Sequence, residues 1–277
     1  MKKKALRMIV TAAAVLVAAT ASAFSVDTVD VSSKYLDRPM RVTVYTPEAA
    51  KQVKKLPTVY LLNGFGGDYR AWPNVRPDLG EYADHYGMVI VCPSGMNSWY
   101  WNSPENPGMQ MESFFVETLV PYIRKHFPSS PEARLNAITG LSMGGHGALW
   151  LGTRHPNIWH NLGSTSGGVN ILPFPERWKM AEQLGPYKNN PERWEQHTVI
   201  NLVPQMAENK QNIIFDCGTN DVFTKVTAEL HQKLLDAKVN HDYISRPGQH
   251  NRKYWNNSIL YQLLFFHENF KKSGEKF

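Results

Sequence analysis

The residue best suited to chemistry in this chain is Ser142, which stands in the run Gly-Leu-Ser-Met-Gly over residues 140–144. The apolar residues 135–139 before it are typical of a short buried strand, and residues 143–154 after it are typical of a helix. Glycines two positions away on each side permit a tight strand-to-helix turn, because larger side chains would collide there. Such a turn exposes the serine hydroxyl in front of the helix N-terminus. The pattern therefore predicts a nucleophilic serine.

A serine hydroxyl needs a base to take its proton, and the base needs a carboxylate to fix its tautomer. Asp221 follows the apolar run 212–217, and His250 follows the run 243–245. Both lie in glycine-containing loops after expected parallel strands, where sheets of this class place their sites. The chain order of serine, then acid, then histidine is that of the α/β-hydrolases. We therefore predict Ser142 as nucleophile, His250 as base and Asp221 as acid.

Other titratable residues fit these roles less well. Asp216 is the alternative acid, but it lies inside an apolar run and would point into the sheet. His146 is close enough to Ser142 to line the site, yet it lies on the wrong side of the helix start to act as base, and we expect it to be structural. The remaining candidates have helical or strand contexts: Asp236, His231, His267 and His241.

Acyl transfer also needs donors for the oxyanion. The backbone N–H of Met143, directly after the nucleophile, is one expected donor. The second is the N–H of Phe65, in the glycine-rich loop 63–67 after the expected strand 58–62. The alternative for this loop is an ordinary glycine turn. We expect substrate contacts from Gly64 in the same loop, together with Trp99 and Trp178.

The N-terminal residues 1–23 have the pattern of a secretory signal. Four basic residues precede an apolar run over 8–19, and Ala-Ser-Ala at 21–23 provides a cleavage site. The apolar run is short for a membrane span, although a retained anchor is the alternative. We therefore expect export to the periplasm or the extracellular space, without stable membrane insertion after cleavage. Removal of residues 1–23 lowers the formal net charge of the chain from +6 to +2, and no basic stripe remains to predict nucleic-acid binding.

Residues 24–277 are predicted to form one α/β domain with a mostly parallel central sheet and helices on both faces. Two N-terminal strands with alternating polarity are expected to be antiparallel, over 26–35 and 40–45. Buried parallel strands are expected over 58–62, 88–92, 135–139, 162–165, 212–217 and 243–245. Helices are expected over 111–126, 143–154, 222–237 and 254–271.

The segment 170–210 interrupts this alternation. It is rich in proline, contains Trp178 and Trp194, and has no strand pattern. We interpret it as an inserted cap of short helices that walls the site, since loops above such sheets carry substrate contacts. We expect the region around 174–178 to reach the cleft, and both tryptophans could face a substrate. The alternative is a packing element away from the site.

The sequence gives no sign of a cofactor. His155 and His160 do not have the spacing of a helical metal-ligand pair, and no phosphate-binding glycine motif is present. Cys92 and Cys217 end apolar runs that should not be neighbouring strands, so we expect two buried free thiols rather than a disulfide.

Four segments together resemble the esterase D family of α/β-hydrolases, which includes tributyrin-type acetyl esterases, feruloyl esterases, S-formylglutathione hydrolases and mycobacterial mycolyltransferases. The similarity runs over residues 35–267, and the segments are 61–67, 136–145, 216–221 and 247–250. The resemblance implies the triad Ser142, Asp221 and His250, with the amides of Phe65 and Met143 as oxyanion donors. Asn63 departs from the pattern, because many relatives carry histidine there. This change would alter hydrogen bonds in the loop without removing an amide donor.

These observations predict an exported serine carboxylesterase acting on short-acyl or feruloyl esters of carbohydrates or other small molecules. The alternatives within this chemistry are a mycolyltransferase-like acyltransferase and an S-formylglutathione hydrolase-like thioesterase. A different class, a non-catalytic carbohydrate-binding descendant, is disfavoured because such a protein has no need of all three predicted catalytic residues.

Overall fold

The computed structural model describes residues 24–274, so the predicted signal at 1–23 lies outside the described residues. A single eight-stranded sheet has the order β1-β2-β4-β3-β5-β6-β7-β8. The strands are β1 (Ser25–Val31), β2 (Met40–Thr46), β3 (Thr58–Leu62), β4 (Val89–Pro93), β5 (Asn136–Gly140), β6 (Asn161–Thr165), β7 (Asn212–Gly218) and β8 (Asp242–Arg246). Strand β2 is antiparallel to β1 and β4, and the six strands β3 to β8 are mutually parallel. The predicted mixed sheet is confirmed, although β1 ends at Val31 rather than at residue 35.

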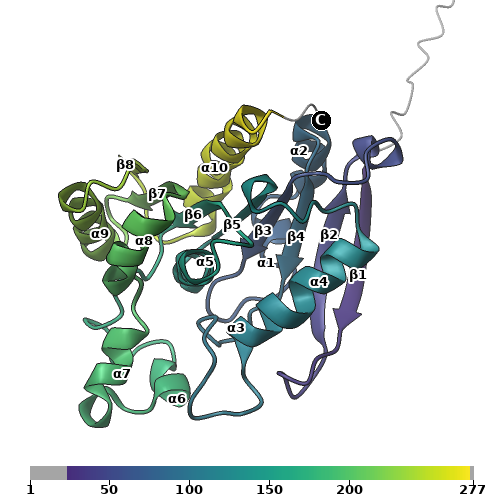
Figure 1. Ribbon diagram of the computed structural model, residues 1–277. Coiled ribbons are helices and arrows are strands. Elements are labelled where there is room, and N and C mark those ends of the chain that lie inside the picture. Colours follow the sequence, from purple (N-terminus) through teal and green to yellow (C-terminus); the bar gives the residue numbers. More distant parts are fainter. Residues whose placement is uncertain (1–23, 275–277) are drawn as a thin grey trace, which may run out of the picture.

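Hydrophobic residues on both faces of the sheet form two core layers. In the fully buried strand β3, Val59 and Leu61 pack in one layer, whereas Tyr60 and Leu62 pack in the other. This division follows from the two-residue period of a strand, which turns neighbouring side chains to opposite faces. Helices cover both layers (Figure 1), as expected for a parallel sheet buried on both sides.

One layer is covered by three helical stretches that the sequence predicts and by α8 (Val203–Asn209), a short helix at the end of the segment 170–210. The three stretches are the continuous run α3 (Met111–Phe114), the π-helical η2 (Phe115–Leu119) and α4 (Val120–His126), then α5 (Met143–Arg154), and α9 (Thr224–Asp236). The other layer is covered by α10 (Arg252–Lys272) and by two helices that we did not predict, α1 (Ala71–Val75) and α2 (Leu79–Tyr86). Helix α1 is short and contains Pro73, which hides its periodicity.

The segment 170–210 contains short helices and no strand, as predicted. Its elements are α6 (Met180–Leu184), η4 (Tyr187–Asn189), α7 (Pro191–Gln196), η5 (Val199–Leu202) and α8. Prolines stand at the first or second residue of α7 and α8, where a missing N–H leaves no helical bond unmade. This segment connects β6 to β7, and α6 and α7 project beyond the sheet (Figure 1).

The two cysteines are buried free thiols, which confirms that expectation. Cys92 lies on β4 and Cys217 on β7, and three strands separate these two in the sheet. Burial raises the pKa of Cys217 to about 12 and raises that of Cys92 further, so both thiols stay protonated near neutral pH.

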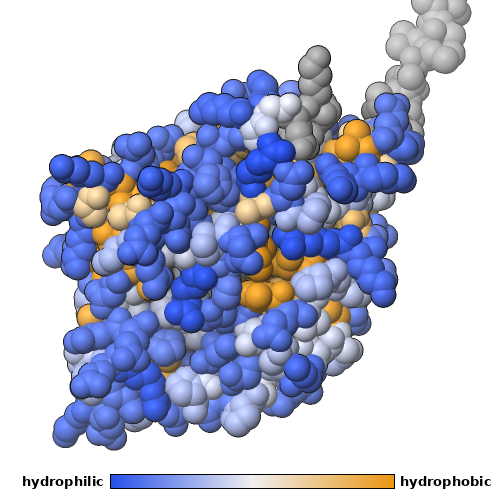
Figure 2. Space-filling view, in the orientation of Figure 1, coloured by the Kyte–Doolittle hydropathy of each residue, from blue (hydrophilic) through white to orange (hydrophobic). Residues whose placement is uncertain are grey.

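The face of the molecule drawn in Figure 2 is mostly hydrophilic, with small apolar patches between polar side chains. No helix within residues 24–274 is both long enough and apolar enough to cross a membrane. Within the same range, no group of three or more His, Cys, Asp or Glu residues is placed to hold a metal ion.

Candidate active site

Ser142 lies at a sharp turn between β5 and α5. Its backbone has φ 57° and ψ −118°, a strained conformation for a residue with a side chain. A Cβ atom on Gly140 would lie 2.4 Å from the Gly144 carbonyl oxygen, and one on Gly144 would lie 2.3 Å from the Leu62 carbonyl oxygen. Glycine is therefore required on both sides of the serine, as the sequence predicts.

Ser142, His250 and Asp221 form a continuous hydrogen-bonded series, which we name the open network. The Nε2 atom of His250 lies 3.0 Å from the Ser142 Oγ atom. Its Nδ1 atom lies 2.9 and 3.0 Å from the two carboxylate oxygens of Asp221. With Nδ1–H donating to Asp221, the Nε2 lone pair is directed at the serine hydroxyl. The arrangement can remove the hydroxyl proton and stabilise the resulting imidazolium.

The loops that carry Asp221 and His250 are joined to each other. The Asn220 N–H donates to the Gly248 carbonyl at 2.9 Å, and the Thr219 N–H donates to the Arg246 carbonyl at 2.9 Å. These bonds extend the β7–β8 pairing beyond the strands. They fix the distance between acid and base, because neither loop can move without the other.

The alternative acid, Asp216, faces away from His250 and belongs to a second cluster, which we name the closed network. Its carboxylate accepts hydrogen bonds from Thr165 at 2.7 Å, Ser258 at 2.6 Å and Gln262 at 2.7 Å. These residues come from β6 and α10. Burial raises the pKa of Asp216, whereas these three donors oppose the rise.

His146 is structural, as expected. Its Nδ1 atom lies 3.1 Å from the Gly168 carbonyl oxygen, so Nδ1–H donates there, and its Nε2 atom accepts from Trp101 at 3.0 Å. Complete burial lowers the pKa of His146 to about 3, which keeps the ring neutral. Both ring nitrogens are used, and neither is available to Ser142.

The glycine-rich loop 63–67 approaches the nucleophile closely. A Cβ atom on Gly64 would lie 3.3 Å from the Ser142 Cβ atom. The Asn63 side chain braces this loop, since its Nδ2 donates to the Gly64 carbonyl at 2.8 Å and its Oδ1 accepts from the Gly95 N–H at 2.7 Å. In the part of the chain that the structure describes, the amides of Phe65 and Met143 have no protein acceptor. They therefore remain available to an incoming oxygen.

A cavity of about 520 Å³ contains Ser142 and His250. The loop 64–67 forms one part of its lining, and Trp178 from the segment 170–210 forms another. Trp178 is held from behind by Trp99, Phe174 and Phe223, with ring centroids 6.1, 5.4 and 5.0 Å away. The segment therefore reaches the site, as expected.

Two of the tryptophan expectations are wrong. Trp99 is only 1% exposed and does not line the cavity, because it stacks on Trp101 and donates from Nε1 to the Trp178 carbonyl at 3.2 Å. Trp194 is fully buried and donates to the Gly185 carbonyl at 2.9 Å, so it cannot face a substrate. Both support the cap from inside.

Sequence reasoning missed several residues of the lining, among them Arg252 and Trp255 in the first turn of α10. The Trp255 ring lies edge-to-face against His250, with a centroid distance of 5.0 Å. Their closeness to His250 in the sequence could have identified them. The loop that carries His250 leads directly into a helix, so residues two and five positions later lie beside the same cavity.

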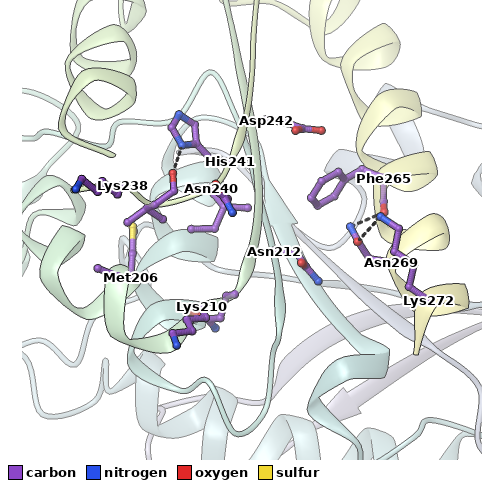
Figure 3. A pocket seen from close by; sticks show the side chains of 14 residues that line it. Met206, Lys210, Asn212, Lys238, Asn240, His241, Asp242, Phe265, Asn269 and Lys272 are labelled. Atoms are coloured by element: carbon purple, nitrogen blue, oxygen red, sulfur yellow. Dashed lines mark hydrogen bonds between the residues drawn. The ribbon is translucent and has the colours of Figure 1, made fainter. Parts of the chain in front are cut away.

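A separate cavity of about 500 Å³ lies where β7 and β8 begin, at the opposite edge of the sheet (Figure 3). Lys210, Lys238 and Lys272 are in its lining, as is His241, whose Nδ1 donates to the Val239 carbonyl at 2.7 Å. None of the predicted site residues line this cavity, whereas Ser142, His250, Gly64, Phe65 and Trp178 line the cavity at the carboxyl edge.

A family model described as "Putative esterase" matches residues 33–266. Acetyl esterase of Caldicellulosiruptor saccharolyticus is 25% identical over 222 residues, covering 74% of this chain and 81% of that protein. S-formylglutathione hydrolase of Mus musculus is 27% identical over 214 residues, covering 69% and 73%. The solved structure of a ferulic acid esterase superposes with a TM-score of 0.77 at 26% identity, covering 89% of this chain and 98% of the other. The fold is thus an α/β-hydrolase fold, and the predicted family is confirmed.

Proposed function

We propose that this chain, a carboxylester hydrolase of the esterase family matched above, is exported and acts on short-acyl or feruloyl esters of carbohydrates. The observation that carries this proposal is the unbroken series from Asp221 through His250 to Ser142 at the wall of an accessible cavity. Gly64 and Trp178 are proposed substrate contacts.

The proposed mechanism proceeds through an acyl-enzyme. Ser142 Oγ attacks the ester carbonyl carbon while His250 Nε2 takes the hydroxyl proton, and Asp221 stabilises the imidazolium. The amides of Phe65 and Met143 bind the negative oxygen of the tetrahedral intermediate. The bond to the leaving alcohol breaks as His250 returns its proton to that oxygen. Water then repeats the sequence on the acyl-enzyme, which releases the acid and regenerates Ser142.

The proposed substrate class draws on two kinds of support. The similar proteins include an acetyl esterase and a ferulic acid esterase. The sequence pattern of residues 1–23 favours an exported enzyme, with residues 24–277 as the mature domain. A thioesterase acting on S-formylglutathione is the second candidate, because a protein of that name is 27% identical to this chain.

Replacing Ser142 with Ala tests the proposal. We expect kcat for 4-nitrophenyl acetate to fall by about 10⁴-fold or more, as for loss of a triad nucleophile. Ser32→Ala, at an exposed serine outside the site, is the matched control and should leave kcat unchanged. Unchanged turnover in the Ser142 variant would favour a binding protein instead.

A panel of acetylated xylan, methyl ferulate, tributyrin and S-formylglutathione then separates the two candidates. We expect the highest kcat/KM on an oxygen ester of the panel. Preference for S-formylglutathione over all three oxygen esters would select the thioesterase.

A further inference from the structure

The charges that line the Ser142 cavity do not balance. Asp68 and Arg70 bind each other, with Arg70 Nε 3.2 and 3.1 Å from the two carboxylate oxygens and its terminal nitrogen 2.6 Å from one of them. Arg252 also lines the cavity. Within residues 24–274 it forms no hydrogen bond or ion pair with another side chain. The cavity therefore presents one guanidinium without a counterion.

This guanidinium is two residues from the proposed general base. Asn251 caps helix α10 by accepting the Tyr254 N–H at 3.1 Å, and Arg252 is the first residue of that helix. The first turn of α10 contains Arg252 and Lys253 and no acidic residue. Cations at this end of a helix oppose its dipole, and acidic residues are favoured there. The position is thus unfavourable for helix stability, and it adds positive potential at the mouth of the cavity.

The remaining lining decides what kind of anion fits. Phe65, Trp178 and Trp255 offer aromatic surface, and the Asp68–Arg70 pair is internally neutralised. An organic molecule with a carboxylate would use both the aromatic surface and the guanidinium. An arginine fork pairs with a carboxylate through two parallel N–H bonds.

We propose that the preferred substrates are esters that carry a carboxylate on the acyl part or on the alcohol part, and that Arg252 binds this carboxylate. The proposal rests on the proposed function, because Ser142 acts on the ester bond of the same molecule. Arg252 is then a specificity residue for the reaction and takes no part in proton transfer.

Two matched pairs of esters test the proposal and locate the charge. 4-Nitrophenyl propionate and 4-nitrophenyl hydrogen succinate differ by a carboxylate on the acyl part, and phenyl acetate and 3-acetoxybenzoate differ by one on the leaving alcohol. In Arg252→Gln we expect kcat/KM for the anionic member of one pair to fall about tenfold, because its KM rises. For the neutral member of that pair, kcat/KM should change less than about twofold. For the Arg252→Lys variant, kcat/KM on the anionic ester should lie between the wild-type and Arg252→Gln values, since lysine keeps the positive charge and loses the two parallel N–H donors of the guanidinium.

Lys253→Gln is the control, because Lys253 is exposed, adjacent and outside the cavity lining. Raising the salt concentration from about 20 mM to about 500 mM should raise KM for the anionic ester and leave KM for the neutral ester unchanged. Equal losses on all four esters in Arg252→Gln would assign Arg252 a structural role. No loss on either anionic ester, or the same loss in Lys253→Gln, would overturn carboxylate binding.

Binding without turnover separates this proposal from the proposed function. Tryptophan fluorescence of the Ser142→Ala variant, titrated with 3-acetoxybenzoate and with 4-nitrophenyl hydrogen succinate, reports occupancy next to Trp178 and Trp255. We expect tighter binding of one of these anions than of its neutral partner, and loss of that preference when Arg252→Gln is added. Absence of any preference would overturn the proposal even if the wild-type enzyme hydrolyses neutral esters.

Discussion

The open network and the closed network each contain an aspartate near the carboxyl end of β7, yet the two carboxylates are suited to different tasks. Asp221 binds His250, a group that can exchange a proton with Ser142 at the cavity wall. Asp216 binds three neutral donors in the interior, and Arg246 lies 4.0 Å away. A carboxylate gains a catalytic role only where its partner titrates and reaches the substrate. The residue type alone does not decide this.

The largest contrast between the networks is expected in activity. Asp221→Asn should lower kcat by about 10⁴-fold, because an amide facing Nδ1 favours the wrong tautomer of His250. Stopped-flow or steady-state hydrolysis of 4-nitrophenyl acetate measures this loss. A decrease of less than about tenfold would show that His250 does not depend on Asp221.

The closed network should respond in stability instead. Asp216→Ala leaves the Thr165, Ser258 and Gln262 donors without their acceptor, and we expect the free energy of unfolding to fall by about 3 kcal/mol. Urea denaturation of this variant and of Asp221→Asn measures the difference. If Asp216→Ala instead reduced kcat as strongly as Asp221→Asn while remaining fully folded, the two networks would not be separable.

The buried histidine His146 makes the stability of the fold depend on pH. Burial lowers the folded-state pKa of His146 to about 3, below the ordinary value of about 6.5, so the unfolded chain binds the additional proton. The stabilisation from neutral His146 is complete above pH 6.5 and is lost as pH falls toward 3. Between pH 6.5 and pH 5 we expect the free energy of unfolding to fall by about 2 kcal/mol from this group. His146→Gln should flatten that slope in urea titrations, and an unchanged slope in this variant would show that His146 is not its source.

Trp178 and Trp194 provide the smallest and most local contrast. Trp178→Ala removes a wall of the cavity, and we expect KM for feruloyl esters to rise by about tenfold with a smaller change in kcat. Trp194→Ala, inside the cap, should lower the melting temperature and leave the KM of the folded enzyme near its wild-type value. A melting-temperature loss without a KM change in Trp178→Ala would make the whole cap structural.

Much of the fold could be predicted because its signals are local. Apolar runs of three to six residues predicted the parallel strands, and the glycines around Ser142 predicted the turn, since both depend on neighbours within a few positions. Helices α1 and α2 were missed because they are short and one contains proline. The closed position of Asp216 followed from its place inside an apolar run.

The tryptophans mark the limit of such reasoning. Trp99, Trp178 and Trp194 all stand in irregular, aromatic-rich stretches, and nothing local distinguishes the one that faces the cavity from the two that are buried. Their exposure depends on how the segment 170–210 packs on the loop around Trp99, a contact between parts about 80 residues apart. The unbalanced charge of Arg252 depends likewise on which acids come near it.

Local patterns in the chain were enough to predict the nucleophile, the acid, the base and the sheet that brings them to one edge, because backbone sterics and hydrophobic period act over short distances. Long-range packing set which aromatic rings line the cavity and which cation remains unpaired there. Those properties are set by burial and by distance between remote segments, and neither quantity is encoded in any short stretch of the chain.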